Sequence, residues 1–161
     1  MTRRDMEGAL KLHCVPYLRN LGFKGSFPDL YREANGLVSL LNFQFYSSGG
    51  SVCVNISYGG RNGENIYFRK DAEPRHVRLA HTRVRARLGA ENLIGDKWFC
   101  FAATDAGELR GVQQSPLNIA MQINQLINDV ALPWWSSKAE APVSVAEGGH
   151  GSTQLDGNEQ V

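Results

Sequence analysis

The chain has 161 residues, of which 42% are hydrophobic and 20% are charged. This composition is typical of a globular domain with its own core, and it excludes a chain that is disordered throughout. The net charge of +1 excludes a uniformly charged surface of the kind that recruits nucleic acid or membranes.

The sequence predicts a soluble, cytoplasmic protein. The first residues are charged rather than apolar, and no run reaches the roughly 20 apolar residues of a membrane helix. Cys14, Cys53 and Cys100 lie far apart and form no CxxC pair. We therefore expect reduced, mostly buried thiols rather than a disulfide framework.

The first predicted element is a helix over residues 2–21. Pro16 is expected to kink or split it, because proline has no backbone N–H and clashes with the preceding turn. Gly22 follows as a helix stop. The apolar stripe that predicts this helix consists of Met6, Leu10, Cys14, Leu18 and Leu21.

Three strands are predicted next. Residues 27–32 form a short candidate, and Asn35-Gly36 is typical of a tight hairpin turn. Residues 37–46 and 51–58 give the strongest strand signals, since they are rich in apolar and aromatic side chains. The loop that joins them is short and rich in Ser and Gly.

This short loop also predicts the register of the two strands. If Tyr46 lies opposite Ser51, three apolar pairs share one face of the hairpin, because side chains alternate along a strand. Those pairs are Phe45 with Val52, Phe43 with Val54, and Leu41 with Ile56.

The other face of the hairpin carries a row of polar side chains. We expect Asn42, Gln44, Asn55 and Ser57 to cluster there, with cross-strand Cβ separations of about 5 Å. Buried amides need hydrogen-bond partners. The row is therefore either a recognition surface whose amides contact a ligand, or a structural amide ladder or solvated sheet face.

The middle of the chain is less regular. Residues 66–68 are a candidate strand, and residues 72–79 are ambiguous, with Pro74 suited to the first turn of a helix. Residues 81–88 alternate between apolar and basic side chains and predict a strand. Residues 97–102 predict a buried strand.

The strand predicted over 81–88 would align Arg83, Arg85 and Arg87 on one face, about 6.5–7 Å apart. Its other face would carry Val84, Ala86 and Leu88. Like charges at this spacing must be solvated or paired with acids. The row is either a surface for an anionic partner or a solvent-facing edge that discourages aggregation. The same basic patch would be extended by Arg75, His76, Arg78 and His81.

A C-terminal helix is predicted to begin at Ser115-Pro116, with Ser as the cap and Pro in the first turn. Pro133 is expected to stop it, and Trp134 and Trp135 are expected to dock its end. The core-facing stripe of this helix consists of Ile119, Ile123, Leu126, Ile127 and Val130.

The last part of the chain differs in composition. Residues 137–161 are rich in Gly, Ala, Ser and Glu and contain no aromatic residue. Such a segment buries too little apolar surface to offset the entropy of ordering. We therefore expect a single domain over residues 1–136 and a disordered tail over 137–161.

Five strings of the sequence carry a family resemblance: VPYLRNLGFKGSFPDLYREANG, LLNFQFYSSGGSVCVNISYG, HTRVRARLG, DKWFCF and LINDVALPWW. Their order and spacing, over most of residues 10–136, resemble the bacterial domain of unknown function 4304 family (DUF4304). Gln44 and Asn55 fall on that family's typical Gln and Asn. The sequence departs after Trp98, where the family more often has a second Trp. The resemblance implies an α+β fold and a bacterial origin, and no established activity.

No motif predicts catalysis or a cofactor. The histidines lack the spacing of zinc ligands, and the Gly-rich residues 59–63 lack the GK[ST] ending of a phosphate loop. There is no GxSxG nucleophile elbow. Few aromatic residues adjoin the arginines along the chain, which argues against nucleic-acid binding. We expect a protein that is not an enzyme and that uses no metal, cofactor, nucleic acid or membrane.

The predicted fold class is α+β: a mainly antiparallel sheet with the N-terminal and C-terminal helices packed on one face. The polar and basic side chains expected on the opposite face favour a non-catalytic protein-interaction module. In its sharpest form, this module is a bacterial immunity protein that binds and neutralises a cognate toxin or effector. The alternative is a small-ligand-binding domain, which needs a cavity of about 300 Å³ or more over the amides. The candidate binding residues are Asn42, Gln44, Asn55, Ser57, Arg83, Arg85 and Arg87.

Overall fold

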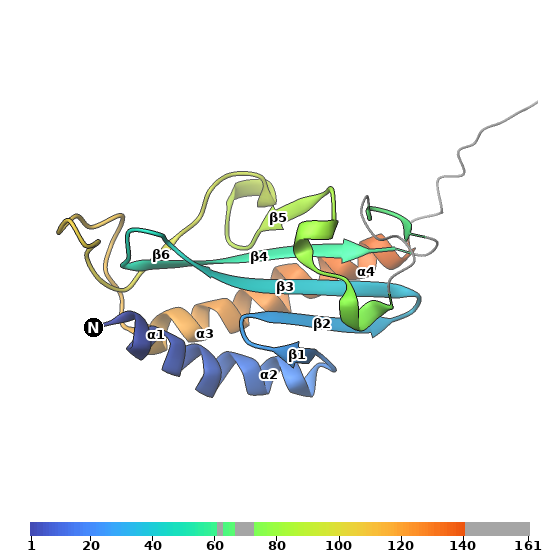
Figure 1. Ribbon diagram of the computed structural model, residues 1–161, viewed down its shortest axis with the longest axis horizontal. Helices are drawn as coiled ribbons and strands as arrows, with labels where there is room; N and C mark the ends of the chain where they lie inside the picture. The colour runs from blue at the N-terminus through green and yellow to red at the C-terminus, as the bar shows by residue number, and fades with distance from the viewer. Residues whose placement is uncertain (61–62, 67–72, 141–161) are drawn as a thin grey trace, which may run out of the picture.

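The computed structural model describes residues 1–60, 63–66 and 73–140. Within them the chain forms one antiparallel sheet with helices on one face (Figure 1), which confirms the predicted α+β fold. The sheet order is β1–β2–β3–β4–β5, and β6 pairs with β4 beside β5. The strands are β1 (Lys24–Ser26), β2 (Asp29–Ala34), β3 (Leu37–Phe45), β4 (Ser51–Gly59), β5 (Arg85–Arg87) and β6 (Phe99–Cys100).

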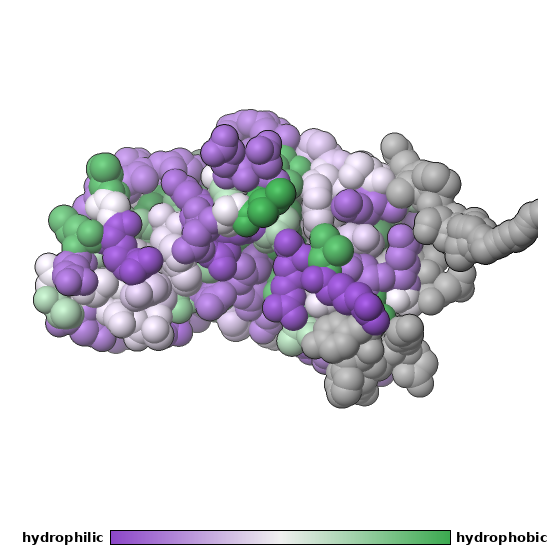
Figure 2. All heavy atoms as spheres, turned by 90° about the horizontal axis from the view of Figure 1, so that it is seen from above, coloured by the Kyte–Doolittle hydropathy of each residue, from purple (hydrophilic) through white to green (hydrophobic). Residues whose placement is uncertain are grey.

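Two long helical segments cover one face of the sheet, and Figure 2 looks onto the other face. The N-terminal segment consists of α1 (Arg3–Ala9), the π turn η1 (Leu10–Cys14) and α2 (Val15–Asn20). The C-terminal segment consists of α3 (Pro116–Leu126), the π turn η6 (Ile127–Ala131) and α4 (Leu132–Glu140). Among the described residues, no helix is both long enough and apolar enough to cross a membrane.

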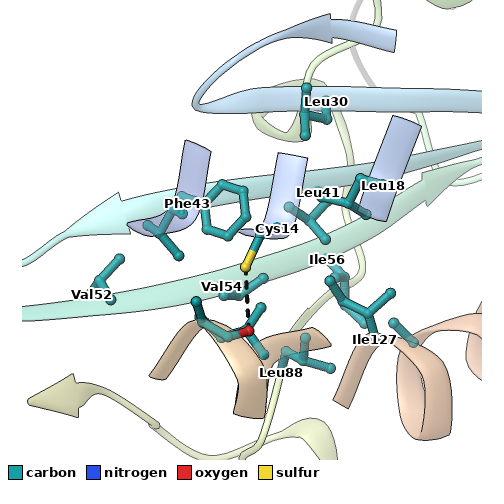
Figure 3. Close-up of a cluster of buried hydrophobic side chains, with 14 of the residues drawn as sticks. Cys14, Leu18, Leu30, Leu41, Phe43, Val52, Val54, Ile56, Leu88 and Ile127 are labelled. Atoms are coloured by element: carbon teal, nitrogen blue, oxygen red, sulfur yellow. Dashed lines mark hydrogen bonds between the residues drawn. The ribbon is translucent and has the colours of Figure 1, made fainter. Parts of the chain in front are cut away.

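The main core lies between these helices and the apolar face of β3 and β4 (Figure 3). Phe43 and Val54 reach into it from the sheet, and Cys14 and Ile127 from the two helical segments. The Cys14 thiol donates a hydrogen bond to the Ala120 carbonyl oxygen (3.4 Å) and so joins the two segments. Burying each large apolar side chain contributes roughly 1.5–3 kcal/mol.

The prediction that Pro133 stops the C-terminal helix is wrong, because α4 continues to Glu140. Immediately before this proline, the Leu132 N–H bonds to the Ile127 carbonyl oxygen, five residues back. This wider turn makes room for a ring that would otherwise clash with the carbonyl four residues back. Pro16 is accommodated in the same way behind η1.

The π turns also keep each apolar stripe in line. An α-helix turns by about 100° per residue, so a stripe that repeats every four residues drifts by about 40° at each step. A turn with bonds five residues apart takes up extra chain and offsets that drift. Two four-residue series are buried along their whole length: Met6, Leu10, Cys14 and Leu18, and Ile119, Ile123, Ile127, Ala131 and Trp135.

The predicted hairpin is confirmed in position and in register. The Tyr46 N–H donates to the Ser51 carbonyl oxygen (2.9 Å) at its turn. The preceding turn has positive φ at Asn35 (56°) and Gly36 (77°), as a type I′ hairpin requires. All three predicted apolar pairs are present in the structure: Phe45 with Val52, Phe43 with Val54, and Leu41 with Ile56.

Several predicted strands have different bounds. β2 begins at Asp29 rather than at residue 27, and β1 was not predicted. The predicted strand 81–88 is reduced to β5, and Val84 is 49% exposed instead of facing the core. The cause is Asn65: the Val84 N–H donates to its Oδ1 (2.7 Å), and its Nδ2 donates to the Val84 carbonyl oxygen (3.2 Å). A side-chain amide thus replaces the strand ladder. The predicted strand 97–102 is likewise reduced to β6.

A second, smaller core covers part of the face opposite the helices. It consists of Val38, Leu40, Ile66 and Val77, with Tyr31 packed against it. Val77 stands between two short 3₁₀ turns, η3 (Pro74–His76) and η4 (Leu79–His81). Of the predicted strand 66–68, Ile66 forms a single bridge with Thr82, and the rest lies outside the described residues. Residues 137–140 belong to α4, and the predicted tail from 141 onward also lies outside the described residues.

Candidate binding pocket

The amides predicted to share one face form a hydrogen-bonded row across β3 and β4. The Asn55 Nδ2 donates to both the Asn42 Oδ1 (3.2 Å) and the Gln44 Oε1 (2.9 Å). The Asn42 Nδ2 in turn donates to the Asp29 Oδ1 (2.8 Å) on β2. Each amide is therefore oriented by its neighbour.

Arg87 of β5 continues this row. β5 pairs with β4 so that Arg87 lies opposite Asn55, and its Nε donates to the Asn55 Oδ1 (2.9 Å). Its Nη1 donates to the Asp96 Oδ1 (2.5 Å), and its guanidinium lies 5.1 Å from the ring centroid of Trp98. The Trp98 Nε1 donates to the other oxygen of Asp96 (3.0 Å). These contacts hold the guanidinium in one place on three sides.

A pocket of about 550 Å³ opens above this row. Its floor is the amide row, and its walls come from η4 and the residue before it, from β5, and from the loop after the short turn η5 (Glu91–Leu93). In Figure 2, which looks onto this face, hydrophilic residues gather over its middle. The lining residues include Asp29, Asn42, Gln44, Asn55, Arg78, Arg85, Arg87 and Ile94.

Three guanidiniums meet at this pocket. Arg87 is paired with Asp96, whereas Arg78 and Arg85 donate to backbone carbonyl oxygens, at 2.6 Å (Arg75) and 3.4 Å (Ala80). A guanidinium has five N–H donors, so all three keep donors for a ligand. Such planar donors match carboxylate and phosphate groups, which accept two parallel hydrogen bonds.

The predicted site residues divide into two groups. Asn42, Gln44, Asn55, Arg85 and Arg87 all line the pocket. The other two do not.

Ser57 is fully buried, and its hydroxyl bonds to the Thr82 Oγ1 (2.6 Å) and the Val84 carbonyl oxygen (2.7 Å). Arg83 lies in the segment before β5, outside the pocket lining. Arg83 lies outside the pocket because β5 begins only at Arg85, and Ser57 is covered by Thr82 and Val84 of the segment before that strand.

Asp29 and the loop at Ile94 were missed by the sequence analysis, and Arg78 appeared only as an extension of the basic patch. A signal for Asp29 was present. The Asn35-Gly36 turn sets Ala34 opposite Leu37, and the same register sets Asp29 opposite Asn42. No local sequence pattern predicts that the loop at Ile94 lines the pocket.

The structure also brings aromatic rings to the arginines. The Tyr46 and Trp98 rings lie edge to face, with centroids 5.2 Å apart. The Arg110 guanidinium lies 4.1 Å from the Tyr46 centroid, and Arg87 lies over Trp98. Aromatic rings therefore lie beside these arginines in space, although few adjoin them along the chain.

One thiol lies beneath the amides. The Cys53 Sγ is 3.8 Å from the Gln44 Oε1, and burial raises the pKa of this thiol to about 11. At neutral pH it is therefore a neutral thiol rather than a nucleophilic thiolate. Among the described residues, no three His, Cys, Asp or Glu side chains are grouped so as to hold a metal ion.

Comparison with known proteins identifies a family. The family model described as "Domain of unknown function (DUF4304)" matches residues 14–137, which is most of the chain and includes the whole pocket lining. The search of curated proteins found no match. The search of solved structures found none either. The chain therefore belongs to the family that this model describes.

Proposed function

We propose that this member of the DUF4304 family is a non-catalytic binding module whose pocket receives an anionic group, a carboxylate or a phosphate. The observation that carries the proposal is the convergence of Arg78, Arg85 and Arg87 with three oriented amides on one pocket of about 550 Å³. Asp96 offsets the charge of Arg87, and a bound anion offsets the repulsion that Arg78 and Arg85 add to the same cavity.

The chemistry of the lining favours binding over catalysis. Guanidiniums and amides neither gain nor lose protons near neutral pH, so they serve as fixed donors rather than as general acids or bases. The thiol beneath them is neutral.

A protein partner that presents an acidic side chain is one source of the anion. The observation that favours it is Ile94, which lines the pocket and is 86% exposed. Protein–protein contact surfaces place apolar side chains at their centre and polar or charged ones around them, and Ile94 stands among arginines in this way. In its sharpest form, the partner is a toxin with an acidic surface that this protein neutralises.

A small anionic molecule is the second candidate. The observation that favours it is the volume, which falls within the range of about 300–1,000 Å³ that is usual for small-molecule sites.

The test uses inorganic phosphate and isothermal titration calorimetry. Arg85→Ala should weaken phosphate binding roughly tenfold or more, because a hydrogen bond to a charged group contributes about 1.5–3 kcal/mol. Arg83→Ala makes the same charge change outside the pocket and should have little effect. Equal effects of the two variants would contradict the anion pocket.

Affinity purification from the native host then distinguishes the two sources. A stoichiometric protein that is lost with Arg85→Ala and kept with Arg83→Ala supports the partner. Recovery of the free chain alone, with phosphate binding intact, supports the small ligand.

A further inference from the structure

A second pocket of about 450 Å³ lies beside the first, between the N-terminal helix and the end of β3. Asn42 and Gln44 line both pockets. The two hollows therefore adjoin at these amides, where the edge of β3 separates the polar face of the sheet from its helix side, and together they are called the groove.

The lining of the second pocket differs from that of the first. Phe27, Phe43 and Phe45 line it, and the Phe27 and Phe43 rings stack with centroids 5.4 Å apart. Its cations lie on these rings: the Lys11 Nζ is 5.2 Å from the Phe27 centroid, and the Arg3 guanidinium is 4.4 Å from that of Phe45. This pocket suits an apolar side chain with negative charge nearby.

The edge of β3 at this point is open within the described ranges. β2 pairs with β3 only as far as Asn42, and the Phe43 N–H then donates to the Pro28 carbonyl oxygen (3.0 Å). Backbone groups of alternate residues point to the same edge of a strand, so the N–H and C=O of Phe45 point the same way. None of the strand pairings among the described residues occupies that edge beside Phe45.

An extended segment that pairs with this edge places side chains in both pockets at once. Side chains of an extended segment alternate between the two faces of a sheet. A residue beside Gln44 therefore points to the arginine-lined pocket, and the next residue, beside Phe45, points to the aromatic pocket. Addition of a strand to an exposed edge is a common mode of peptide recognition.

We propose that the groove binds an extended acidic segment of a partner protein, with acidic side chains in the first pocket and an apolar side chain in the second. This inference rests on the proposed anion pocket. Charge complementarity favours it: five cations line the groove, against three carboxylates, namely Asp29, Glu7 paired with Arg3 (3.1 Å) and Asp96 paired with Arg87 (2.5 Å). The cations are Arg3, Lys11, Arg78, Arg85 and Arg87.

The probe is the fluorescently labelled peptide acetyl-Glu-Phe-Glu-Phe-Glu-amide, followed by anisotropy with the full-length chain. Replacing its Phe residues by Ser, or its Glu residues by Lys, should weaken binding at least about tenfold. Hydrogen exchange by NMR should show that the Phe45 amide becomes protected when the peptide binds. Tighter binding of a DNA oligonucleotide or of anionic phosphatidylserine vesicles than of the peptide would overturn the inference.

Two matched variants separate this inference from the anion pocket. Lys11→Glu should weaken peptide binding about tenfold and leave phosphate binding unchanged, because it alters only the second pocket. Lys24→Glu makes the same change on β1, outside both pockets, and should alter neither. If the two variants bind the peptide equally while Arg85→Ala still loses phosphate, the groove is refuted and the anion pocket stands. If Arg85→Ala keeps phosphate binding, both fail.

Discussion

The face of the sheet that carries the helices buries long apolar side chains, whereas the opposite face holds amides and guanidiniums by hydrogen bonds to one another. Both faces carry tryptophan. Trp135 is 1% exposed among the helices, while Trp98 is half-buried beside Arg87. Apolar burial is non-directional and supplies stability, and a hydrogen-bonded network fixes orientation. The comparison predicts that substitutions on the helix face cost folding free energy, and those on the pocket face cost binding.

The two tryptophans test this division most strongly. Trp135→Ala should lower the free energy of unfolding by about 3–5 kcal/mol, because it leaves a cavity beside Phe23 and frees the Ser57 carbonyl oxygen that accepts from the Trp135 Nε1 (2.8 Å). Trp98→Ala should lower the free energy of unfolding by only about 1–2 kcal/mol, and its main effect should be weaker phosphate binding. Urea unfolding and calorimetry measure both effects. Equal losses of stability would show that the two faces do not divide folding and binding in this way.

The amide row provides the next largest effect. Asn55→Ala removes the partner of Asn42, Gln44 and Arg87 together, and should cost about 1–3 kcal/mol and most of the phosphate affinity. Gln44→Ala truncates an exposed amide of the same row and should cost less than about 1 kcal/mol. The midpoints of urea unfolding for the two variants measure this difference in stability. If the amide row contributes nothing to stability, the two variants should show small and equal losses in the free energy of unfolding.

Two thiols, one on each face, predict how stability depends on pH. Burial raises the pKa of Cys14 to about 12 and that of Cys53 to about 11, from an ordinary value of 9.0. The unfolded chain therefore loses these protons first, so each contribution is complete below about pH 9 and declines above it, by up to about 1.4 kcal/mol per pH unit. The Cys53 contribution stops falling near pH 11, and the Cys14 contribution near pH 12.

Urea unfolding between pH 8 and pH 11 measures this decline. Cys14→Ala and Cys53→Ala should each flatten the alkaline limb relative to the parent chain. An unchanged slope in both variants would show that other groups cause the loss.

The smallest effect concerns a helix cap. The Ser115 Oγ accepts a hydrogen bond from the Asn118 N–H (3.1 Å), and Ser115→Ala should cost about 1 kcal/mol. Because the cap belongs to the helix face, phosphate binding should stay unchanged. A loss of affinity in this variant would couple the two faces more closely than the comparison allows.

The features that the sequence predicted correctly depend on local periodicity. The alternation at residues 41–56 predicted the hairpin, its register and therefore the shared face of Asn42, Gln44 and Asn55. Arg85 and Arg87 followed from the same parity argument on the neighbouring strand. Period-two patterns are informative wherever one face of a strand is buried.

The features that were missed depend on contacts between distant segments. Val84 left the predicted strand because Asn65, far back along the chain, satisfies its backbone. Arg78 and Ile94 reach the pocket from turns whose course follows such contacts rather than local propensity. The continuation past Pro133 was missed because the rule that proline ends a helix assumes bonds four residues apart.

The widened turns have one more consequence, which concerns length. Each long helix presents its apolar series to the sheet only because its π turn corrects the rotation in the middle. Loss of one residue within 127–131 is absorbed there, because the turn returns to bonds four residues apart. Loss of one exposed residue of α3, such as Met121, is not absorbed in this way, and it turns Ile119 by about 100° around the helix axis relative to Ile123. Outside their π turns, these helices thus tolerate changes in the identity of exposed side chains far better than a change in the number of residues they contain.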